Sequence, residues 1–157
     1  MTQKELEALI IRMQDTLYRV SATILHQPCD REDAIQECIL KAIDKRDALR
    51  EDKAARSWIV RILINECYRI LRAYKRTYAL DALPEPEPAP DADRDMHRIL
   101  FSLPDQFRLP TVLYYVEGYS AKEIAAMLHL PSGTIKSRLA RARSKMKQEY
   151  MREADDR

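Results

Sequence analysis

The residues from Thr134 to Lys147 have the chemical types and the spacing needed to bind DNA. Thr134 and Ser137 supply short hydrogen-bonding groups near the start of this stretch. The stretch holds six cationic side chains and no acidic one, the cations being Lys136, Arg138, Arg141, Arg143, Lys145 and Lys147. In a recognition helix, side chains near the N-terminal end reach base edges in the major groove, while flanking cations bind phosphates. The pattern predicts a recognition helix; a merely solvated basic helix is the alternative, although such a helix usually carries glutamate partners.

A short helix is predicted directly before this stretch, from about Ser120 to His129. Ser120 can cap its N-terminus, and Glu123 stands at the reciprocal position of a capping box. The apolar face of this helix would consist of Ile124, Ala125 and Leu128.

The residues between these two helices have the composition of a tight turn. Pro131 cannot continue a helix, Ser132 can cap a new one, and Gly133 tolerates the close approach of two helices at a steep angle. The core-facing side of the second helix would consist of Ile135, Leu139, Ala142 and Met146. The two helices and their turn therefore predict a helix-turn-helix.

A second basic helix is predicted from Ala55 to Arg76. Its cations face a single acid, Glu66, and they are Arg56, Arg61, Arg69, Arg72, Lys75 and Arg76. This excess of positive charge suits phosphate binding. Tyr68 and Tyr74 could stack on unpaired bases, although packing is the more common role of such rings. The core stripe would consist of Trp58, Ile59, Ile62, Leu63, Cys67, Ile70 and Leu71.

An acidic and amide stripe is predicted on an earlier helix, DREDAIQECILKAIDKR, with Asp30 as its cap and Asp33 at the capping-box position. The stripe consists of Asp33, Gln36, Glu37, Lys41 and Asp44. The opposite, buried side would consist of Ile35, Cys38, Ile39, Ala42 and Ile43. Since residues three and four apart share a helix face, a solvated surface would explain the stripe by itself.

The rest of the chain is predicted to be helical apart from one linker. Thr2 to His26 should form one amphipathic helix, and Met96–Leu103 and Pro104–Glu117 two more, with Pro110 kinking or delimiting the last. Residues 78–95 are rich in proline and acid and lack apolar periodicity, so they predict an extended linker. The helices after the linker would pack beneath the helix-turn-helix through Leu100, Phe101, Leu103, Phe107, Val112, Leu113 and Val116.

The predicted fold class is all-α, with two small helical domains joined by the Pro/acid-rich linker and the helix-turn-helix in the C-terminal domain. A length of 157 residues allows two small domains, and a content of two glycines with abundant helix formers favours helices. The expected boundaries are 1–76, 77–95 and 96–157.

Composition also bounds the function. The net charge of +2 hides a segregation into basic helices and an acidic linker. The three cysteines, Cys29, Cys38 and Cys67, are odd in number, and two fall on apolar faces, so buried reduced thiols are expected rather than a disulfide or a metal site. The sequence offers no catalytic constellation and no Gly-rich phosphate loop, so we expect no enzyme activity, cofactor, metal or small-molecule substrate. With no signal peptide or membrane-length apolar run, a cytoplasmic location is expected.

Taken in order, these parts resemble the extracytoplasmic-function (ECF) group of sigma factors, the smallest members of the sigma-70 family. DREDAIQECILKA is similar to the polymerase-binding helix of that family's first domain, and RSWIVRILINECYRILR to its −10 helix. LPDQFRLPTVLYYVEGYSAKEIAAMLHLPSGTIKSRLARAR is similar to the second domain, which reads the −35 element. The three segments occur in the family's order and at its separations.

The resemblance implies a role for each predicted surface. The implied partner is core RNA polymerase, with its β′ and β subunits, and a coiled coil of the β′ subunit would bind Asp33, Gln36, Glu37 and Lys41. The −10 element would be contacted by Arg56, Arg61, Asn65, Arg69 and Arg72, with a flipped base held by the preceding loop from Asp47 to Ala55; many relatives carry an acid where this chain has Arg69. The −35 element would be contacted by Thr134, Lys136, Ser137, Arg138 and Arg141. A cognate anti-sigma factor, often membrane-anchored, is a further implied partner.

Three functions are candidates for a chain with these features. The leading one is a promoter-specificity subunit that binds core RNA polymerase and directs transcription initiation. The alternative is a stand-alone helix-turn-helix transcriptional regulator, which would need a dimer seam to read two half-sites. A helical protein that binds RNA nonspecifically would leave the helix-turn-helix unexplained.

Overall fold

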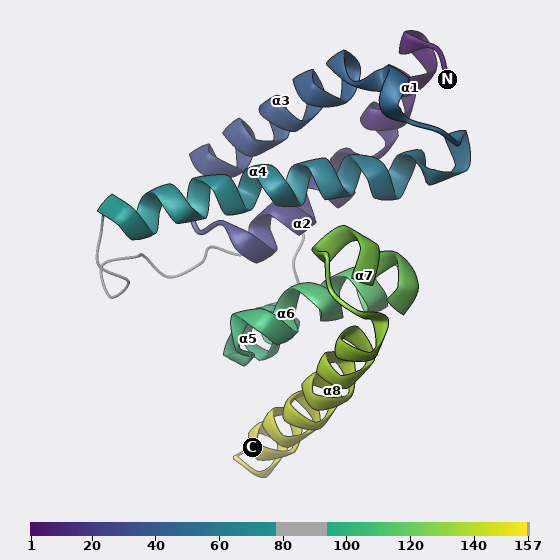
Figure 1. Ribbon diagram of the computed structural model, residues 1–157. Helices are drawn as coiled ribbons and strands as arrows, with labels where there is room; N and C mark the ends of the chain where they lie inside the picture. The colour runs from purple at the N-terminus through teal and green to yellow at the C-terminus, as the bar shows by residue number, and fades with distance from the viewer. Residues whose placement is uncertain (78–93, 157) are drawn as a thin grey trace. The chain divides into compact units, whose positions relative to one another are not determined.

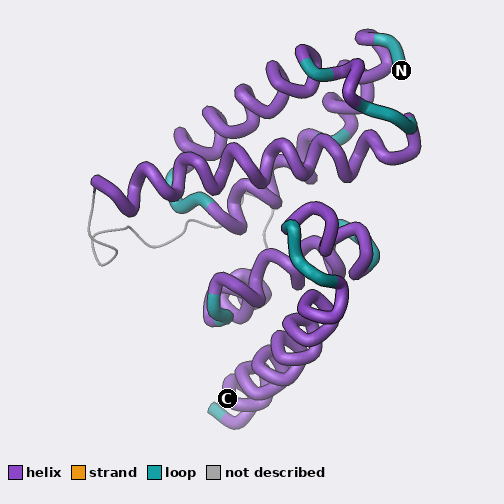
Figure 2. Tube along the Cα trace, viewed as in Figure 1, coloured by secondary structure: helices purple, strands orange, loops and turns teal. Residues whose placement is uncertain are grey.

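The computed structural model describes residues 1–77 and 94–156, and these residues form helices and short connections without a strand (Figures 1 and 2). The chain divides into two compact units, Met1–Glu87 and Pro88–Arg157. The all-α prediction is confirmed. The predicted linker, 77–95, lies mostly outside the described residues, and its last two residues are already helical because α5 begins at Arg94.

The described part of the first unit, residues 1–77, forms four α-helices, α1 Gln3–Arg12, α2 Gln14–Ile24, α3 Pro28–Asp44 and α4 Ala55–Thr77. Two short 3-10 turns, η1 Arg46–Ala48 and η2 Asp52–Ala54, precede α4. The prediction of one helix from Thr2 to His26 is wrong, because the chain breaks at Met13, whose φ of −94° and ψ of 5° are not helical. The Met13 side chain is fully buried in the core. The apolar periodicity of the sequence therefore continues across the break between α1 and α2.

The start of α3 differs from its prediction. The helix begins at Pro28 with Gln27 as its N-cap, so Asp30 lies inside the first turn and does not cap it. Proline suits this position because its fixed φ is helical and the amide that it lacks would have no partner in the helix. The buried Arg31 then ties the helix to the preceding loop, since its Nε donates to the Leu25 carbonyl at 2.9 Å.

Helices α3 and α4 lie side by side and pack against α2, as Figure 1 shows. Five predicted core residues are buried: Cys38, Ala42, Ile59, Leu63 and Cys67. Seven others are only half-buried: Ile35, Ile39, Ile43, Trp58, Ile62, Ile70 and Leu71. Their predicted places in the core are taken by Ala34, Val60 and Ile64.

The cysteines of the first unit are free thiols, as expected, with Cys29 exposed and the other two buried. The Cys38 thiol donates to the Ile59 carbonyl at 3.5 Å, across the α3–α4 contact. Burial, together with the nearby Glu66 charge, raises the pKa of Cys38 to about 12, and burial also raises the pKa of Cys67. Both thiols therefore act as small apolar groups in the core.

The second unit contains α5 Arg94–Ser102, α6 Asp105–Thr111, a π-helical turn η4 Val112–Val116, α7 Ala121–Leu128 and α8 Ser132–Asp155. Pro110 lies inside α6, and the chain passes into the π turn two residues later. Leu103, Phe107, Val112 and Leu113 are buried as predicted. The prediction for Val116 is wrong, because this side chain is 51% exposed.

The helix-turn-helix forms largely as predicted. Ser120 and Glu123 make the reciprocal capping box of α7, and His129 ends that helix with a left-handed φ of 56°. The predicted cap of α8 is wrong, because Pro131 occupies the N-cap and Ser132 is the first helical residue. The prediction for Gly133 is also wrong, because a Cβ there would have no heavy atom within 4 Å.

The inner faces of the helix-turn-helix are packed. Ile124 and Ala125 are buried as predicted, whereas Leu128 is half-buried and Met127 is buried in its place. On α8 the predicted stripe is confirmed, with Ile135, Leu139 and Ala142 buried and Met146 half-buried.

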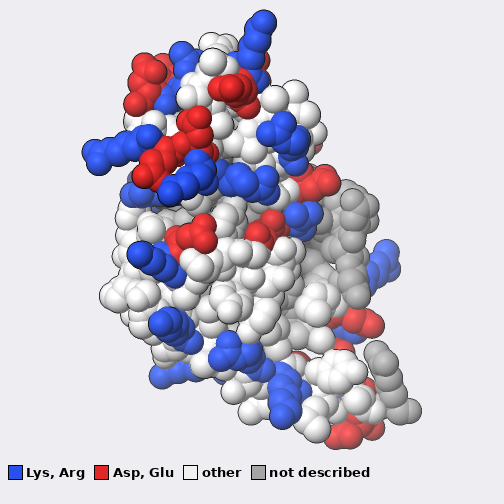
Figure 3. Space-filling view, turned by 90° about the vertical axis from the view of Figure 1, so that its right-hand side faces the viewer, with Lys and Arg blue, Asp and Glu red and all other residues white. Residues whose placement is uncertain are grey.

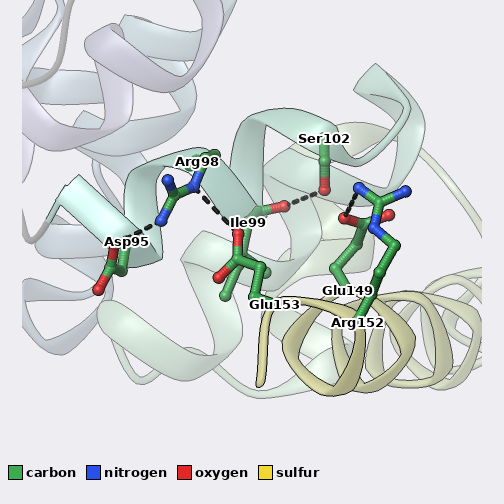
Figure 4. Close-up of polar contacts among 7 residues, drawn as sticks. All are labelled: Asp95, Arg98, Ile99, Ser102, Glu149, Arg152 and Glu153. Atoms are coloured by element: carbon green, nitrogen blue, oxygen red, sulfur yellow. Dashed lines mark hydrogen bonds and ion pairs between the residues drawn. The ribbon is translucent and has the colours of Figure 1, made fainter. Parts of the chain in front are cut away.

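Helix α8 continues past Lys147 to Asp155, and its last turns contact α5 (Figure 4). Arg98 of α5 pairs with Glu153 of α8 at 3.0 Å. Arg98 also pairs with Asp95, while on α8 Arg152 pairs with Glu149 at 2.7 Å. The C-terminal turns of α8 therefore help to hold α5 in the second unit.

Candidate nucleic-acid interface

Helix α4 presents a basic face along most of its length. Arg61, Asn65, Arg69 and Arg72 are all exposed, and at about 100° per residue they fall within about 80° of arc. Arg56 is exposed as well, but it lies in the first turn about 140° away from Arg61. The structure therefore brings four of the five predicted −10 residues onto one face and leaves Arg56 apart from them.

The single acid of α4, Glu66, does not lie on that basic face. Its side chain is buried, with 4% of the residue exposed, and it accepts hydrogen bonds from two cations. Lys41 Nζ of α3 bonds Oε1, and Arg69 Nε bonds Oε2 at 2.9 Å. Burial alone would raise the pKa of Glu66, but the hydrogen bonds and charges of Lys41 and Arg69 outweigh it and hold the pKa below 4.5. Glu66 is therefore ionised and joins the two helices.

The acidic stripe on α3 is only partly a free surface. Asp33 and Gln36 are exposed, whereas Glu37 is half-buried. Lys41 is turned toward the α3–α4 contact by its bond to Glu66. The structure thus groups three of the four predicted polymerase-binding residues and gives the fourth a structural partner.

Leu40 is a residue of this stripe that sequence reasoning missed. It lies between Glu37 and Asp44 along the exposed side of α3, and 64% of it is accessible to solvent. Its place at the helical spacing of the stripe was the available signal, although a single exposed leucine is common on protein surfaces and does not by itself mark a contact site.

Helix α8 presents polar and basic side chains over its whole outer half. Lys136, Ser137 and Arg141 are exposed, and Thr134 and Arg138 are half-buried at its edge. Thr134, Arg138 and Arg141 lie on one flank, Lys136 on the other and Ser137 between them, as about 100° per residue requires. The unpaired amides at the helix N-terminus add partial positive charge near the first of these residues.

The charge along α8 is strongly one-sided. From Ser132 to Gln148 the helix has no acid, and the first is Glu149. On the face drawn in Figure 3, several Lys and Arg side chains lie beside one another at the lower left. Such a surface attracts a polyanion at low ionic strength.

The sequence predicts Arg143 only as one of the cations of this helix, yet the structure gives it a specific partner. Its Nη1 donates to the hydroxyl oxygen of Tyr115, from the π turn, at 3.0 Å. Sequence spacing could not reveal this contact, because it depends on how η4 is wound.

Within residues 1–77 and 94–156, His, Cys, Asp and Glu side chains form no group of three or more suited to a metal ion. Among the helices of these residues, none combines the length and the apolar character needed to cross a membrane.

Both units match described protein families. Residues 9–77 match the family described as Sigma-70 region 2, and residues 94–146 match Sigma-70, region 4. The protein named ECF RNA polymerase sigma factor SigM, from Mycobacterium tuberculosis, is 33% identical over 148 residues, which cover 89% of this chain and 74% of that protein. The ECF RNA polymerase sigma-E factor of Escherichia coli K12 is 29% identical over 161 residues, covering 90% of this chain and 84% of that protein.

Solved structures agree with these matches. The sigma factor RpoE of Bartonella quintana, crystallised with the anti-sigma factor NepR, superposes with a TM-score of 0.80 at 25% identity, covering 92% of this chain and 96% of that one. CnrH, solved in complex with the cytosolic domain of CnrY, has the same fold, with a TM-score of 0.70 at 24% identity, covering 95% of this chain and 89% of that one.

Proposed function

The chain belongs to the ECF group of sigma factors in the sigma-70 family, and from this membership we propose which of its surfaces bind core polymerase, the −10 element and the −35 element. Sigma factors bind core RNA polymerase and direct transcription initiation. They are binding subunits rather than enzymes. The observation that carries the proposal is the pair of basic helices, α4 and α8, one in each of two compact units.

Residues 1–76 would bind core polymerase and the −10 element. The polymerase surface would be the exposed side of α3, with Asp33, Gln36 and Glu37 at its centre and Lys41 at its edge. The −10 surface would be the basic face of α4, formed by Arg61, Asn65, Arg69 and Arg72, with Arg56 reaching the DNA from the start of the helix. These two surfaces lie on neighbouring helices, so one rigid unit can hold DNA against the polymerase.

Residues 96–157 would bind the −35 element through the outer half of α8. Ser137 and the residues beside it would face base edges, while the arginines on the flanks would bind phosphates. The segment 77–95 would connect the two DNA-binding units. Each unit alone makes a small, salt-sensitive interface with DNA, so polymerase must hold both units on one promoter to raise their effective concentration.

An anti-sigma factor is a further proposed partner. RpoE was crystallised with the anti-sigma factor NepR, and CnrH was solved in complex with the cytosolic domain of CnrY. Such a partner would cover the stripe at 33–41 or the basic helices. The site of action would be the cytoplasm, where polymerase and promoter DNA meet, and a membrane-anchored partner would hold the chain at the membrane.

The proposal is tested by run-off transcription and permanganate footprinting with core polymerase on a pool of promoters. Asp33→Ala/Glu37→Ala should lower both transcripts and melting, because it removes two charges of the polymerase surface. The matched control is Glu7→Ala/Asp15→Ala, which removes two exposed acids of α1 and α2 in the same unit. Sequence-specific DNA binding without core, and no melting in its presence, would contradict the proposal and favour the stand-alone regulator.

A further inference from the structure

Tyr115 contacts the DNA-facing helix without belonging to it. Nη1 of Arg143 donates to its hydroxyl oxygen at 3.0 Å, although the two residues are 28 positions apart. Tyr115 is 49% exposed and Arg143 is exposed too. A bond between two solvated groups adds little to the stability of a fold. Its physical effect is to limit the directions in which the guanidinium can point.

The π-helical turn is what presents Tyr115 to α8. In η4 the Glu117 amide donates to the Val112 carbonyl at 3.0 Å, five residues back. Leu113 of this turn is fully buried, while the next three side chains, Tyr114, Tyr115 and Val116, are exposed. Single π turns of this kind occur frequently at functional sites.

The ring of Tyr115 is held from a second side. Tyr114 packs against it edge-on, with ring centroids 4.9 Å apart. The hydroxyl of Tyr115 is therefore fixed by the ring contact at one end of the side chain and by Arg143 at the other. A tyrosine loses few rotamers when it is fixed, so it makes an efficient support for a long arginine.

Arg143 lies on the flank of α8 that also carries Lys136 and Lys147. At about 100° per residue it is only about 20° from Lys136 and about 40° from Lys147. All three are exposed. The flank is a row of cations along the helix axis, and the bond to Tyr115 occupies one of the five N–H donors of Arg143.

We propose that Tyr115 is a positioning residue for promoter binding, which orients Arg143 so that its remaining donors contact a DNA phosphate beside the −35 element. The proposal rests on the assignment of α8 as the −35 helix. A phosphate contact fixes the register of a protein on DNA and carries no sequence information itself. Tyr115 thus acts on DNA through Arg143.

The test measures equilibrium binding of holoenzyme, made from core polymerase and the full chain, as a function of salt. The probe is the promoter most enriched from a random DNA pool by the unmodified holoenzyme. The variants are Tyr115→Phe, Arg143→Ala and the double variant. Tyr114→Phe is the matched control, because it removes the neighbouring exposed hydroxyl, which makes no hydrogen bond to α8 within the described residues.

Arg143→Ala should weaken binding roughly ten-fold and reduce the slope of log affinity against log salt by about one. Tyr115→Phe should weaken it roughly three-fold, Tyr114→Phe should not, and the double variant should match Arg143→Ala. The loss in Tyr115→Phe should be the same for every single-base variant of the −35 element, because a phosphate contact does not discriminate bases. If Tyr115 and Arg143 had purely structural roles, the salt slope would stay that of the unmodified chain, and the losses of the two single variants would add up in the double variant.

Equal binding by Tyr115→Phe and the unmodified chain would overturn the inference, as would fully additive losses in the double variant or an unchanged salt slope in Arg143→Ala. In each of these outcomes the proposed function stands, since the unmodified holoenzyme still binds its promoter. Failure of the unmodified chain to give core-dependent binding would overturn the proposed function and this inference together.

Discussion

Replacing Lys41 and Arg69, the two cations that bind Glu66, should weaken the contact between α3 and α4 and lower the free energy of unfolding. Glu66 is 4% exposed, while the side chains of Lys41 and Arg69 are 37% and 57% exposed. Removing one cation leaves the carboxylate one charged hydrogen bond, so Lys41→Met or Arg69→Met should each cost about 1 kcal/mol. Removing both leaves a buried charge without these partners, which should cost about 3 kcal/mol.

A third substitution distinguishes buried charge from lost packing. Adding Glu66→Leu to the double variant should recover about 2 kcal/mol, because it removes the stranded carboxylate and keeps an apolar side chain in its place. Arg72→Met/Lys75→Met is the matched control, since it removes two exposed cations from the same helix and should cost less than about 1 kcal/mol.

The pH dependence of stability should change sign. In the unmodified chain the lowered pKa of Glu66 adds stability that is complete above pH 4.5 and is lost as pH falls through the folded-state pKa. In the double variant burial acts alone and raises this pKa, so stability should fall as pH rises above 4.5. Comparing each protein with its own Glu66→Gln derivative isolates the titration of this one group.

The assay is urea unfolding followed by the fluorescence of Trp58, the single tryptophan of the chain, which lies in α4 and so reports on the first unit. Measurements from about pH 3 to about pH 8 give the free energy of unfolding for each variant on both sides of the ordinary glutamate pKa. A double variant no less stable than its control, or one whose stability depends on pH as the unmodified chain's does, would refute the reasoning.

Three further predictions concern the caps and the thiols. Ser120→Ala should destabilise the second unit by about 1 kcal/mol in thermal unfolding followed by circular dichroism, and no change would show that the capping box is not formed in solution. His129→Ile should cost at least about 1 kcal/mol in the same assay, because a β-branched residue resists the left-handed backbone, whereas His129→Gly should avoid that strain; equal loss in both would contradict this. With a thiol reagent at pH 8 only Cys29 should react in the native chain, and Cys38 and Cys67 should react after unfolding; rapid native labelling of three thiols would contradict their burial.

The sequence predicted the elements that follow strong local rules. Ser120 with Glu123 predicted a helix start, and the spacing of Ile135, Leu139 and Ala142 predicted the buried side of α8. These features depend on residues a few positions apart, so their geometry follows from the helix period alone. The exposed arginines of α4 were predicted for the same reason.

The features that the sequence did not predict depend on contacts between distant residues or on small backbone changes. No proline or glycine marks Met13, so the break between α1 and α2 has no local signal, and the apolar period continues through it. The burial of Glu66 depends on Lys41, 25 positions earlier. Composition favours Ser132 as the cap of α8, and only the backbone geometry shows that Pro131 occupies that position.

The π turn at Val112–Val116 also has a consequence for how this domain can change in length during evolution. A π turn closes its hydrogen bonds over one residue more than an α turn. Loss of one codon here would let the turn close as an α-helix, whereas the same loss inside α7 or α8 would rotate all later side chains by about 100° and move the core stripe out of the core. Single-residue deletions in the second unit should therefore be best tolerated at 114–116, where they would remove an exposed side chain and leave the helix-turn-helix packed.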